Sequence, residues 1–325
     1  MQMLAGVFLV RCFFLFLLLM SGSAIANVKV LVLNPDVNLI NDVAKNLEKA
    51  LKAQKIEAKL KSVSQDISDG KFRDLLEEYK PGLLIVFDNK LLGYAIKASE
   101  SKEFKNIPVI SVMSLNLKQT IASNKNATGV AYEIPPFLLI DSFNRFLKKR
   151  IDKVAVIYRE GLFDWYIEEA KKQLEYSKVT LIAEAIPKDT NANDVEKLLA
   201  SAFKRFKKEK ADAFWLITDN AIINQATMKN LKELTNNLRM PFLCGVKNLV
   251  TKEFDLCTFS SLPDDEVVVE QSLEQTLAIV EDKLAPHDLK VEYLERVVKI
   301  LNIEKLESFG YSVDKSKLEE IEVAE

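Results

Sequence analysis

Polar, charged and aromatic side chains follow the ends of several short apolar runs, and these residues are the best placed to do chemistry. Carboxylates, amides, a hydroxyl and a guanidinium can fix the orientation of a small molecule, and aromatic rings can stack on it. The candidate ligand-binding residues are Asn34, Asp36, Phe87, Asp88, Asn89, Met113, Ser114, Tyr158, Arg159, Thr218, Asp219, Asn220, Gly245 and Lys247. Arg159 could bind a carboxylate through two parallel hydrogen bonds. This set of side chains favours the binding of a small molecule.

The sequence offers little for catalysis. His287 is the only histidine, so neither a histidine-ligated metal site nor a Ser-His-Asp triad can form. The sequence contains neither G-x-G-x-x-G nor G-x-x-x-x-G-K-[ST], so no nucleotide cofactor is expected. The acidic run Asp264–Glu266 is better explained as the first turn of a helix than as a set of metal ligands. We expect no enzyme, cofactor or metal, although an acid–base pair of Asp88 and Asp219 stays open.

A repeated pattern of apolar runs and helical periodicity positions these residues. The run Ala213–Ile217 stops at a Thr-Asp-Asn sequence, and a helix-patterned segment and a second run, Met240–Gly245, follow. The same order occurs earlier, where Leu83–Phe87 stops at Asp-Asn and leads through a helical stretch to Ile107–Val112. Short apolar runs without alternation are typical of strands buried on both faces of a parallel sheet.

Taken together, these patterns predict an α/β fold made of two Rossmann-like lobes with parallel sheets and a cleft between them. The first half alternates strands and helices from Val28 to Val112, and the order restarts at Lys153. Further strands are expected over Glu253–Phe259 and Val291–Leu301. Open α/β sheets bind ligands beyond the carboxyl ends of their strands, which is where the candidate residues lie. The competing interpretation is that Asp88 and the Thr-Asp pair at 218–219 only cap their helices.

The N-terminus has the pattern of a signal peptide. Arg11 precedes the apolar run Phe13–Met20, and the small residues Ser21–Ala26 follow it. The Ala-x-Ala sequence at 24–26 predicts cleavage after Ala26, which makes the mature protein periplasmic. The alternative is an uncleaved membrane anchor.

Charge and cysteine content limit the partners. The formal net charge is −2, so the chain lacks the basic surplus typical of nucleic-acid binding, and no nucleic acid is expected as a partner. Cys244 and Cys257 follow the signal peptide. In an exported protein they could form a disulfide, and two buried thiols are an equally good interpretation. We expect a monomer.

From about Val28 to Gly310 the chain resembles the ABC transporter substrate-binding protein family. That family has the type I periplasmic binding fold, and the resemblance is to the branch with predicted tryptophan and tyrosine binders. The order and spacing of several pieces carry it together: Ala127–Pro136, Val154–Tyr158, Ala211–Asn220, Met240–Gly245 and Ile300–Gly310.

The resemblance implies a periplasmic solute-binding protein that closes on its ligand by a hinge motion and docks on an ABC permease. Its three lobe crossings would fall near Glu133–Pro135, Ser261–Pro263 and Pro286–Lys290. Lobe 1 would then hold 27–134 and 263–288, and lobe 2 would hold 135–262 and 289–325. The alternatives are a sensory binding protein that reports to a membrane receptor, a non-binding scaffold, and an enzyme on the same fold.

Two departures from the family leave the ligand open. The family commonly has Gly-Thr or Gly-Ser after the third strand, whereas this chain has Phe87-Asp88-Asn89, and Asp88 would repel a ligand carboxylate there. The family's Gly-rich stretch late in lobe 2 is replaced by Phe254–Ser261. We therefore expect this chain to share the fold of the family, and we do not predict its substrate from the family.

Overall fold

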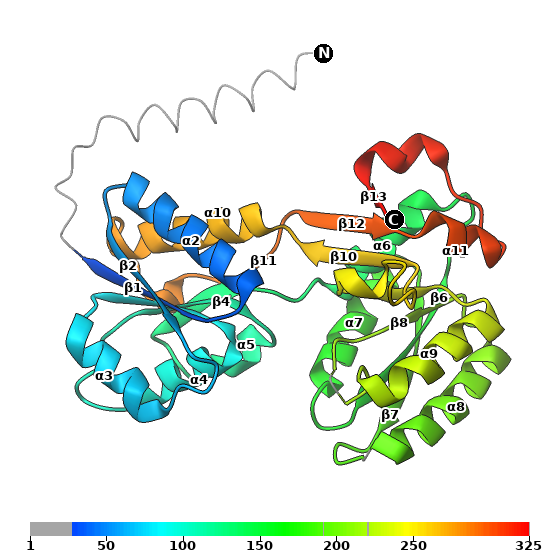
Figure 1. The fold of residues 1–325 in the computed structure, drawn as a ribbon, viewed down its shortest axis with the longest axis horizontal. Coiled ribbons are helices and arrows are strands. Elements are labelled where there is room, and N and C mark those ends of the chain that lie inside the picture. The colour runs from blue at the N-terminus through cyan, green and yellow to red at the C-terminus, as the bar shows by residue number, and fades with distance from the viewer. Residues whose placement is uncertain (1–27, 191, 220, 325) are drawn as a thin grey trace. The chain divides into compact units, whose positions relative to one another are not determined.

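A computed structural model describes residues 28–190, 192–219 and 221–324 (Figure 1). The expected signal peptide, 1–26, and its cleavage site lie outside these residues, as does the candidate ligand-binding residue Asn220. Across the described ranges, every helix is too short or too polar to cross a bilayer.

The chain divides into two compact units. Unit 1 holds the chain up to Val112 together with Gln119–Gly129 and Val269–Lys290. Unit 2 holds Met113–Lys118, Val130–Val268 and Val291–Glu325. The expected lobe boundaries fell after 134, 262 and 288, whereas the units divide after 129, 268 and 290 and assign 113–118 to unit 2.

The first sheet has six strands in the order β11-β5-β4-β3-β1-β2, of which β11 and the last two residues of β4 and of β5 are assigned to unit 2. The strands are β1 (Lys29–Pro35), β2 (Glu57–Val63), β3 (Leu83–Phe87), β4 (Val109–Ser114), β5 (Ala127–Ala131) and β11 (Glu292–Tyr293). The helices are α2 (Asn38–Ala53), α3 (Asp69–Tyr79), α4 (Asp88–Ser99), α5 (Leu117–Thr120) and α10 (Asp265–Val280). Every residue of β3, β4 and β5 is buried, as the apolar runs predicted, whereas the edge strand β2 has a mixed burial pattern.

The sheet of unit 2 has seven strands in the order β13-β12-β10-β9-β8-β6-β7. The strands are β6 (Lys153–Arg159), β7 (Thr180–Ile186), β8 (Ala213–Trp215), β9 (Phe242–Cys244), β10 (Phe259–Pro263), β12 (Val297–Leu301) and β13 (Glu322–Val323). The α-helices are α6 (Pro136–Phe146), α7 (Asp164–Tyr176), α8 (Ala192–Glu209), α9 (Gln225–Leu238) and α11 (Ile303–Ser308). Short 3-10 helices are η1 (Lys247–Leu249) and η3 (Lys315–Glu320) in unit 2, and η2 (Pro286–Asp288) in unit 1. The sheet is parallel except where β10 pairs with β12.

The sheet of unit 2 is buried on both faces, and side chains alternate between two cores. Phe214 contributes to the core under α8 and α9, where its ring lies 4.7 Å from that of Phe242 and 4.9 Å from that of Phe203. Its neighbour Trp215 points to the other face and contributes to the core with Phe143 of α6. The two-residue repeat of a strand accounts for this division.

Two expected strands are placed differently in the structure. Glu253–Phe259 is not one strand, because Asp255 adopts a left-handed φ of 47° and Leu256 and Cys257 both donate to the carbonyl of Leu249; β10 begins only at Phe259. Val291–Leu301 is also not one strand. It supplies β11 to the first sheet and β12 to the second.

Gly129 in β5 is required by a close approach to β4. Its φ is 156°, and a Cβ atom built on it would lie 2.0 Å from the carbonyl oxygen of Ser111. No side chain fits there without moving the backbone.

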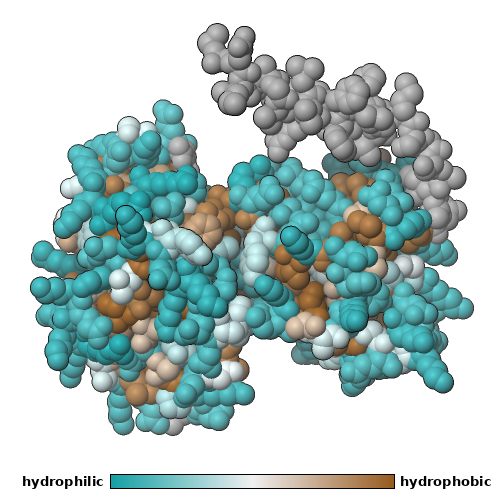
Figure 2. All heavy atoms as spheres, turned by 180° about the vertical axis from the view of Figure 1, so that it is seen from behind, coloured by the Kyte–Doolittle hydropathy of each residue, from teal (hydrophilic) through white to brown (hydrophobic). Residues whose placement is uncertain are grey.

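The surface is predominantly hydrophilic on the face drawn in Figure 2, where apolar areas are small and separated by polar residues. Large hydrophobic side chains that are exposed, such as Phe137 and Tyr176, come from different elements.

Candidate functional site

Arg159 and Asp219 meet at the carboxyl edge of the sheet of unit 2. Arg159 ends β6, and Asp219 follows the neighbouring strand β8. Arg159 Nε donates to Asp219 Oδ2 at 2.7 Å, and Nη2 donates to Oδ1 at 2.9 Å. The Asp219 side chain is 1% exposed and that of Arg159 is 25% exposed. A protein carboxylate thus occupies the Arg159 guanidinium in this structure, and the binding of a ligand carboxylate by Arg159 stays a prediction.

The Asp219 carboxylate also fixes the loop that follows β8. Its Oδ1 accepts a hydrogen bond from the backbone N–H of Ala221 at 2.9 Å. Thr218 is exposed on the same loop. Gly245 lies beside it, since a Cβ atom built on Gly245 would be 3.8 Å from Thr218 Oγ1. The structure thus brings the candidates Arg159, Thr218, Asp219 and Gly245 to one edge.

Lys247, the other candidate cation, is also paired. Its Nζ lies 2.9 Å from Glu322 Oε1 of β13. Both side chains are about half exposed, and such a surface pair contributes little to stability. A ligand could displace it at small cost.

In unit 1 a buried hydrogen-bond network holds the loop after β1. Asn34 is fully buried, and its Nδ2 donates to Pro35 O at 3.0 Å and to Asn41 Oδ1 at 2.5 Å. Ser62 Oγ donates to Asn34 Oδ1 at 3.1 Å. Asn41 Nδ2 donates to the exposed Asp36 Oδ1 at 2.9 Å. Asn34 is therefore a structural residue, and its network positions the Asp36 carboxylate.

Asp88 caps helix α4 from an unusual backbone conformation. Its φ is 72°, in the left-handed region that glycine adopts readily and aspartate tolerates. Its Oδ1 accepts from the N–H of Leu91 at 2.9 Å. Burial raises the pKa of the carboxyl, and these backbone hydrogen bonds offset part of that rise. Glycine adopts this left-handed conformation readily, which gives a physical reason for the glycine that the family resembled by this sequence commonly has after its third strand.

A pocket of about 220 Å³ adjoins Asp88 at the carboxyl ends of β1, β2 and β3. Pro35, Val63, Gln65 and Lys90 contribute to its lining. This is the expected edge for a ligand in an α/β sheet.

Several candidate ligand-binding residues are buried or partly buried in this structure, so their contact with a ligand stays a prediction. Phe87 is fully buried, because it ends a strand covered on both faces, so it offers no stacking surface. Met113 and Ser114 are buried at the end of β4. Tyr158 is half-buried and packs against the second core of unit 2. Asn89 is exposed in the first turn of α4.

Cys244 and Cys257 are free and buried, so the disulfide that the sequence left open is not formed in the structure. Burial raises the pKa of the Cys257 thiol, and a hydrogen bond with Cys244 adds to the rise.

Glu133 is the residue that the sequence analysis missed. It lies between β5 and α6, and both of its carboxylate oxygens are buried without a hydrogen-bond partner in the described part of the chain. Burial raises the pKa of this carboxyl to about 6, and the nearby backbone N–H groups of Glu133 and Asn116 offset only part of the rise. The signal in the sequence was a carboxylate within the run Val130–Pro136, which is otherwise apolar, aromatic or proline.

Two tyrosines lie within electrostatic range of Glu133. Its charge raises the pKa of both Tyr166 and Tyr293, in addition to the larger effect of burial. Tyr166, in the first turn of α7, donates its hydroxyl to Ile134 O at 3.2 Å, and its ring lies 5.4 Å from that of Trp215. Tyr293 of β11 is in register with Ala131 of β5. Tyr166 lies in the helix that follows β6, and Trp215 ends β8.

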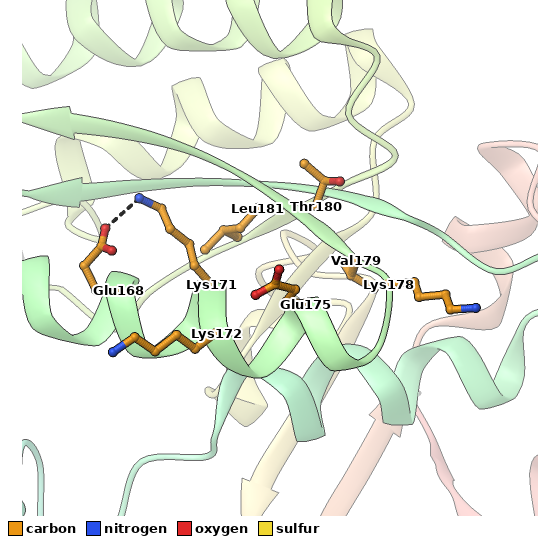
Figure 3. A pocket seen from close by; sticks show the side chains of 8 residues that line it. All are labelled: Glu168, Lys171, Lys172, Glu175, Lys178, Val179, Thr180 and Leu181. Carbon is orange, nitrogen blue, oxygen red and sulfur yellow. Dashed lines mark hydrogen bonds and ion pairs between the residues drawn. The ribbon is translucent and has the colours of Figure 1, made fainter.

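A larger pocket, of about 400 Å³, lies on α7 and the start of β7 (Figure 3). Its charged side chains include Glu168 and Lys171, which form an ion pair at 2.7 Å. It opens at the amino end of β7, away from the edge where α/β sheets bind ligands, so it is not the candidate site. Among the described residues, no group of three potential metal ligands comes together.

Comparison with solved structures establishes the fold. The ligand-free, open structure of CD0873 from Clostridium difficile, a substrate-binding protein with adhesive properties, matches with a TM-score of 0.67 at 14% identity, over 92% of this chain and 99% of that one. An ABC domain from Streptococcus pneumonia in complex with L-Trp matches with a TM-score of 0.60 at 16% identity, over 92% of this chain and all of that one.

A periplasmic ribose ABC transporter protein from Conexibacter woesei matches with a TM-score of 0.57 at 11% identity, over 89% of this chain and 96% of that one. No family model and no curated protein matches the sequence. The chain has the type I periplasmic binding protein fold, as the sequence resemblance implied.

Proposed function

We propose that this protein is a periplasmic solute-binding protein that captures a small molecule without chemical change and delivers it to an ABC importer. The observation that carries the proposal is a fold shared along nearly the whole chain with substrate-binding proteins, together with polar groups at the carboxyl edges of both sheets. The ligand is held by the loops that follow the strands, and hinge closure presents the protein to its permease.

Export is part of this proposal. Cleavage after Ala26 releases the mature protein into the periplasm as a monomer. N-terminal sequencing of the protein from a periplasmic fraction, with size-exclusion chromatography and light scattering, tests both points. A protein that starts at Met1 and stays with the membrane fraction would contradict the cleaved form.

The test of ligand capture is native mass spectrometry of the mature protein purified from its own periplasm, repeated after unfolding and refolding. We expect a small-molecule adduct that is lost on refolding. A clean protein mass, combined with no thermal shift across amino acids, peptides, sugars, nucleosides and amines, would overturn capture and favour a non-binding scaffold. A sensory binding protein of the same fold would bind ligand equally well, so capture of an ABC permease after cross-linking in cells distinguishes it from a transporter component.

A further inference from the structure

We infer that the solute is a small organic cation, an amine or a quaternary ammonium compound, and that the Glu133 carboxylate neutralises its positive charge. This inference rests on the proposed function and names the chemical class of its ligand.

Both candidate cations already have a carboxylate of the protein as partner. Arg159 is held by Asp219 through two hydrogen bonds, and Lys247 pairs with Glu322. A ligand carboxylate would have to displace a carboxylate of the protein from either one. At Arg159 that carboxylate is buried, so its release into a dry environment would be strongly unfavourable.

The acidic groups at the carboxyl edges of the two sheets differ from these cations in their ion pairing. Over the described ranges, no ion pair involves Asp36, Asp88 or Glu133, although Lys90 lies close enough to lower the pKa of Asp88. Lys90 itself donates to the backbone carbonyl of Gln65. In unit 2 the buried Glu133 carboxylate can therefore attract a cation and repel an anion, whereas in unit 1 Lys90 adds a positive charge beside Asp88.

The surroundings of Glu133 are suited to a positively charged group. Both Glu133 carboxylate oxygens are buried, and the nearby backbone N–H groups of Glu133 and Asn116 offset only part of the cost, so a cation from outside would stabilise the charge further. The rings of Tyr166 and Tyr293 lie within electrostatic range of it. Tyrosine faces attract cations through their quadrupole, and this attraction is strengthened where water is excluded. A carboxylate beside aromatic rings is suited to an ammonium group.

Tyr293 is the more exposed of the two tyrosines. It is 38% exposed, whereas Tyr166 is partly buried and packs against Trp215. We therefore expect a ligand to approach from the side of Tyr293, where an ammonium group would replace its own hydration with the carboxylate and the tyrosine rings.

The experiment is isothermal titration calorimetry on the mature protein after refolding to remove bound solute. The probes are putrescine, choline and tyramine, each beside its uncharged counterpart: 1,4-butanediol, 3,3-dimethylbutan-1-ol and 4-ethylphenol. We expect at least one cation to bind, and its counterpart to bind at least about 100-fold more weakly, because the buried charge is then left without a partner.

The Glu133→Gln variant keeps the shape of the side chain and removes its charge. We expect it to lose the bound cation by about 100-fold while its circular dichroism stays unchanged. The matched control is Glu168→Gln, which removes one charge from the exposed face of the neighbouring helix and should retain affinity within about twofold.

The outcomes separate the two proposals. Equal binding of cation and counterpart, or unchanged affinity in Glu133→Gln, overturns the inference. Binding of only sugars, nucleosides or anionic solutes also overturns it and leaves the proposed function standing. Failure of every solute class to bind removes both.

Discussion

The Arg159 guanidinium and the Asp219 carboxylate form two parallel hydrogen bonds of 2.7 and 2.9 Å at the carboxyl ends of adjacent strands. The pair joins two residues that the sequence offered separately as ligand contacts. It neutralises one positive and one negative charge at that edge, whereas the buried carboxylate of Glu133, also in unit 2, has no ion pair among the residues that the structure describes.

Removing the guanidinium should destabilise unit 2. In Arg159→Ala the Asp219 carboxylate stays buried and loses its cation, so we expect the free energy of unfolding to fall by about 3 kcal/mol. The measurement is urea unfolding followed by circular dichroism. Arg150→Ala is the control, since Arg150 makes only a 3.9 Å contact to Asp141 at the surface and should change stability by less than about 0.5 kcal/mol. Equal effects of the two substitutions would show that the Arg159 pair contributes no more than a surface contact.

Glu133 should make stability fall as pH rises. Its pKa is about 6 in the folded protein against 4.5 for the free side chain, so the folded state binds the proton more tightly between these values. The stabilisation from this group is complete below pH 4.5 and is lost as pH rises through 6, so the unfolding free energy should drop by about 2 kcal/mol in total between about pH 3 and pH 7.5, and the drop should be absent in Glu133→Gln. The groups around it that titrate, Tyr166 and Tyr293, keep their protons throughout this range because their pKa values are raised.

The measurement for Glu133 is the difference in unfolding free energy between the wild type and Glu133→Gln at pH 4, 5, 6 and 7. The glutamine variant should gain relative stability steadily over the window, because only the wild type must ionise a buried group. A difference that stays constant with pH would mean that Glu133 has an ordinary pKa and is solvated.

Two glycine-to-alanine substitutions should have opposite effects. In Gly129→Ala the new methyl group meets the Ser111 carbonyl at 2.0 Å, which forces β5 away from β4, and we expect a loss of about 3 kcal/mol. In Gly93→Ala the methyl group meets nothing within 4 Å on helix α4, so a gain of up to about 1 kcal/mol is expected. Thermal unfolding of both variants checks the pair. A Gly129→Ala protein as stable as wild type would contradict the close contact between the strands.

The two buried cysteines should be unreactive in the native protein. Burial raises the pKa of the Cys257 thiol, so little thiolate is present at neutral pH, and access is blocked as well. Ellman's reagent should label neither thiol of the mature protein within minutes and both after unfolding in guanidinium. No labelling after unfolding without reductant, with an intact mass lower by two hydrogens, would show a disulfide instead.

The sequence by itself determined the class of fold and the edge at which to look. Apolar runs without alternation, such as Leu83–Phe87, can satisfy their burial only in a sheet covered on both sides, and the helical segments between them supply the cover. Two such series in one chain predicted two α/β units. Polar residues directly after the runs were bound to lie at the carboxyl ends of the strands.

Only the tertiary structure decided what those residues do. Arg159 and Asp219 are 60 positions apart, and their pairing depends on β6 and β8 being neighbours, which periodicity does not reveal. Val291–Leu301 divides between two sheets because the chain passes from one to the other within it. The fold also brings Tyr166 and Tyr293, distant in sequence, within electrostatic range of Glu133, whose position in an apolar run was the only local sign of its burial. Local pattern sets which face a residue occupies, whereas its partner is set by which segments the fold brings beside it.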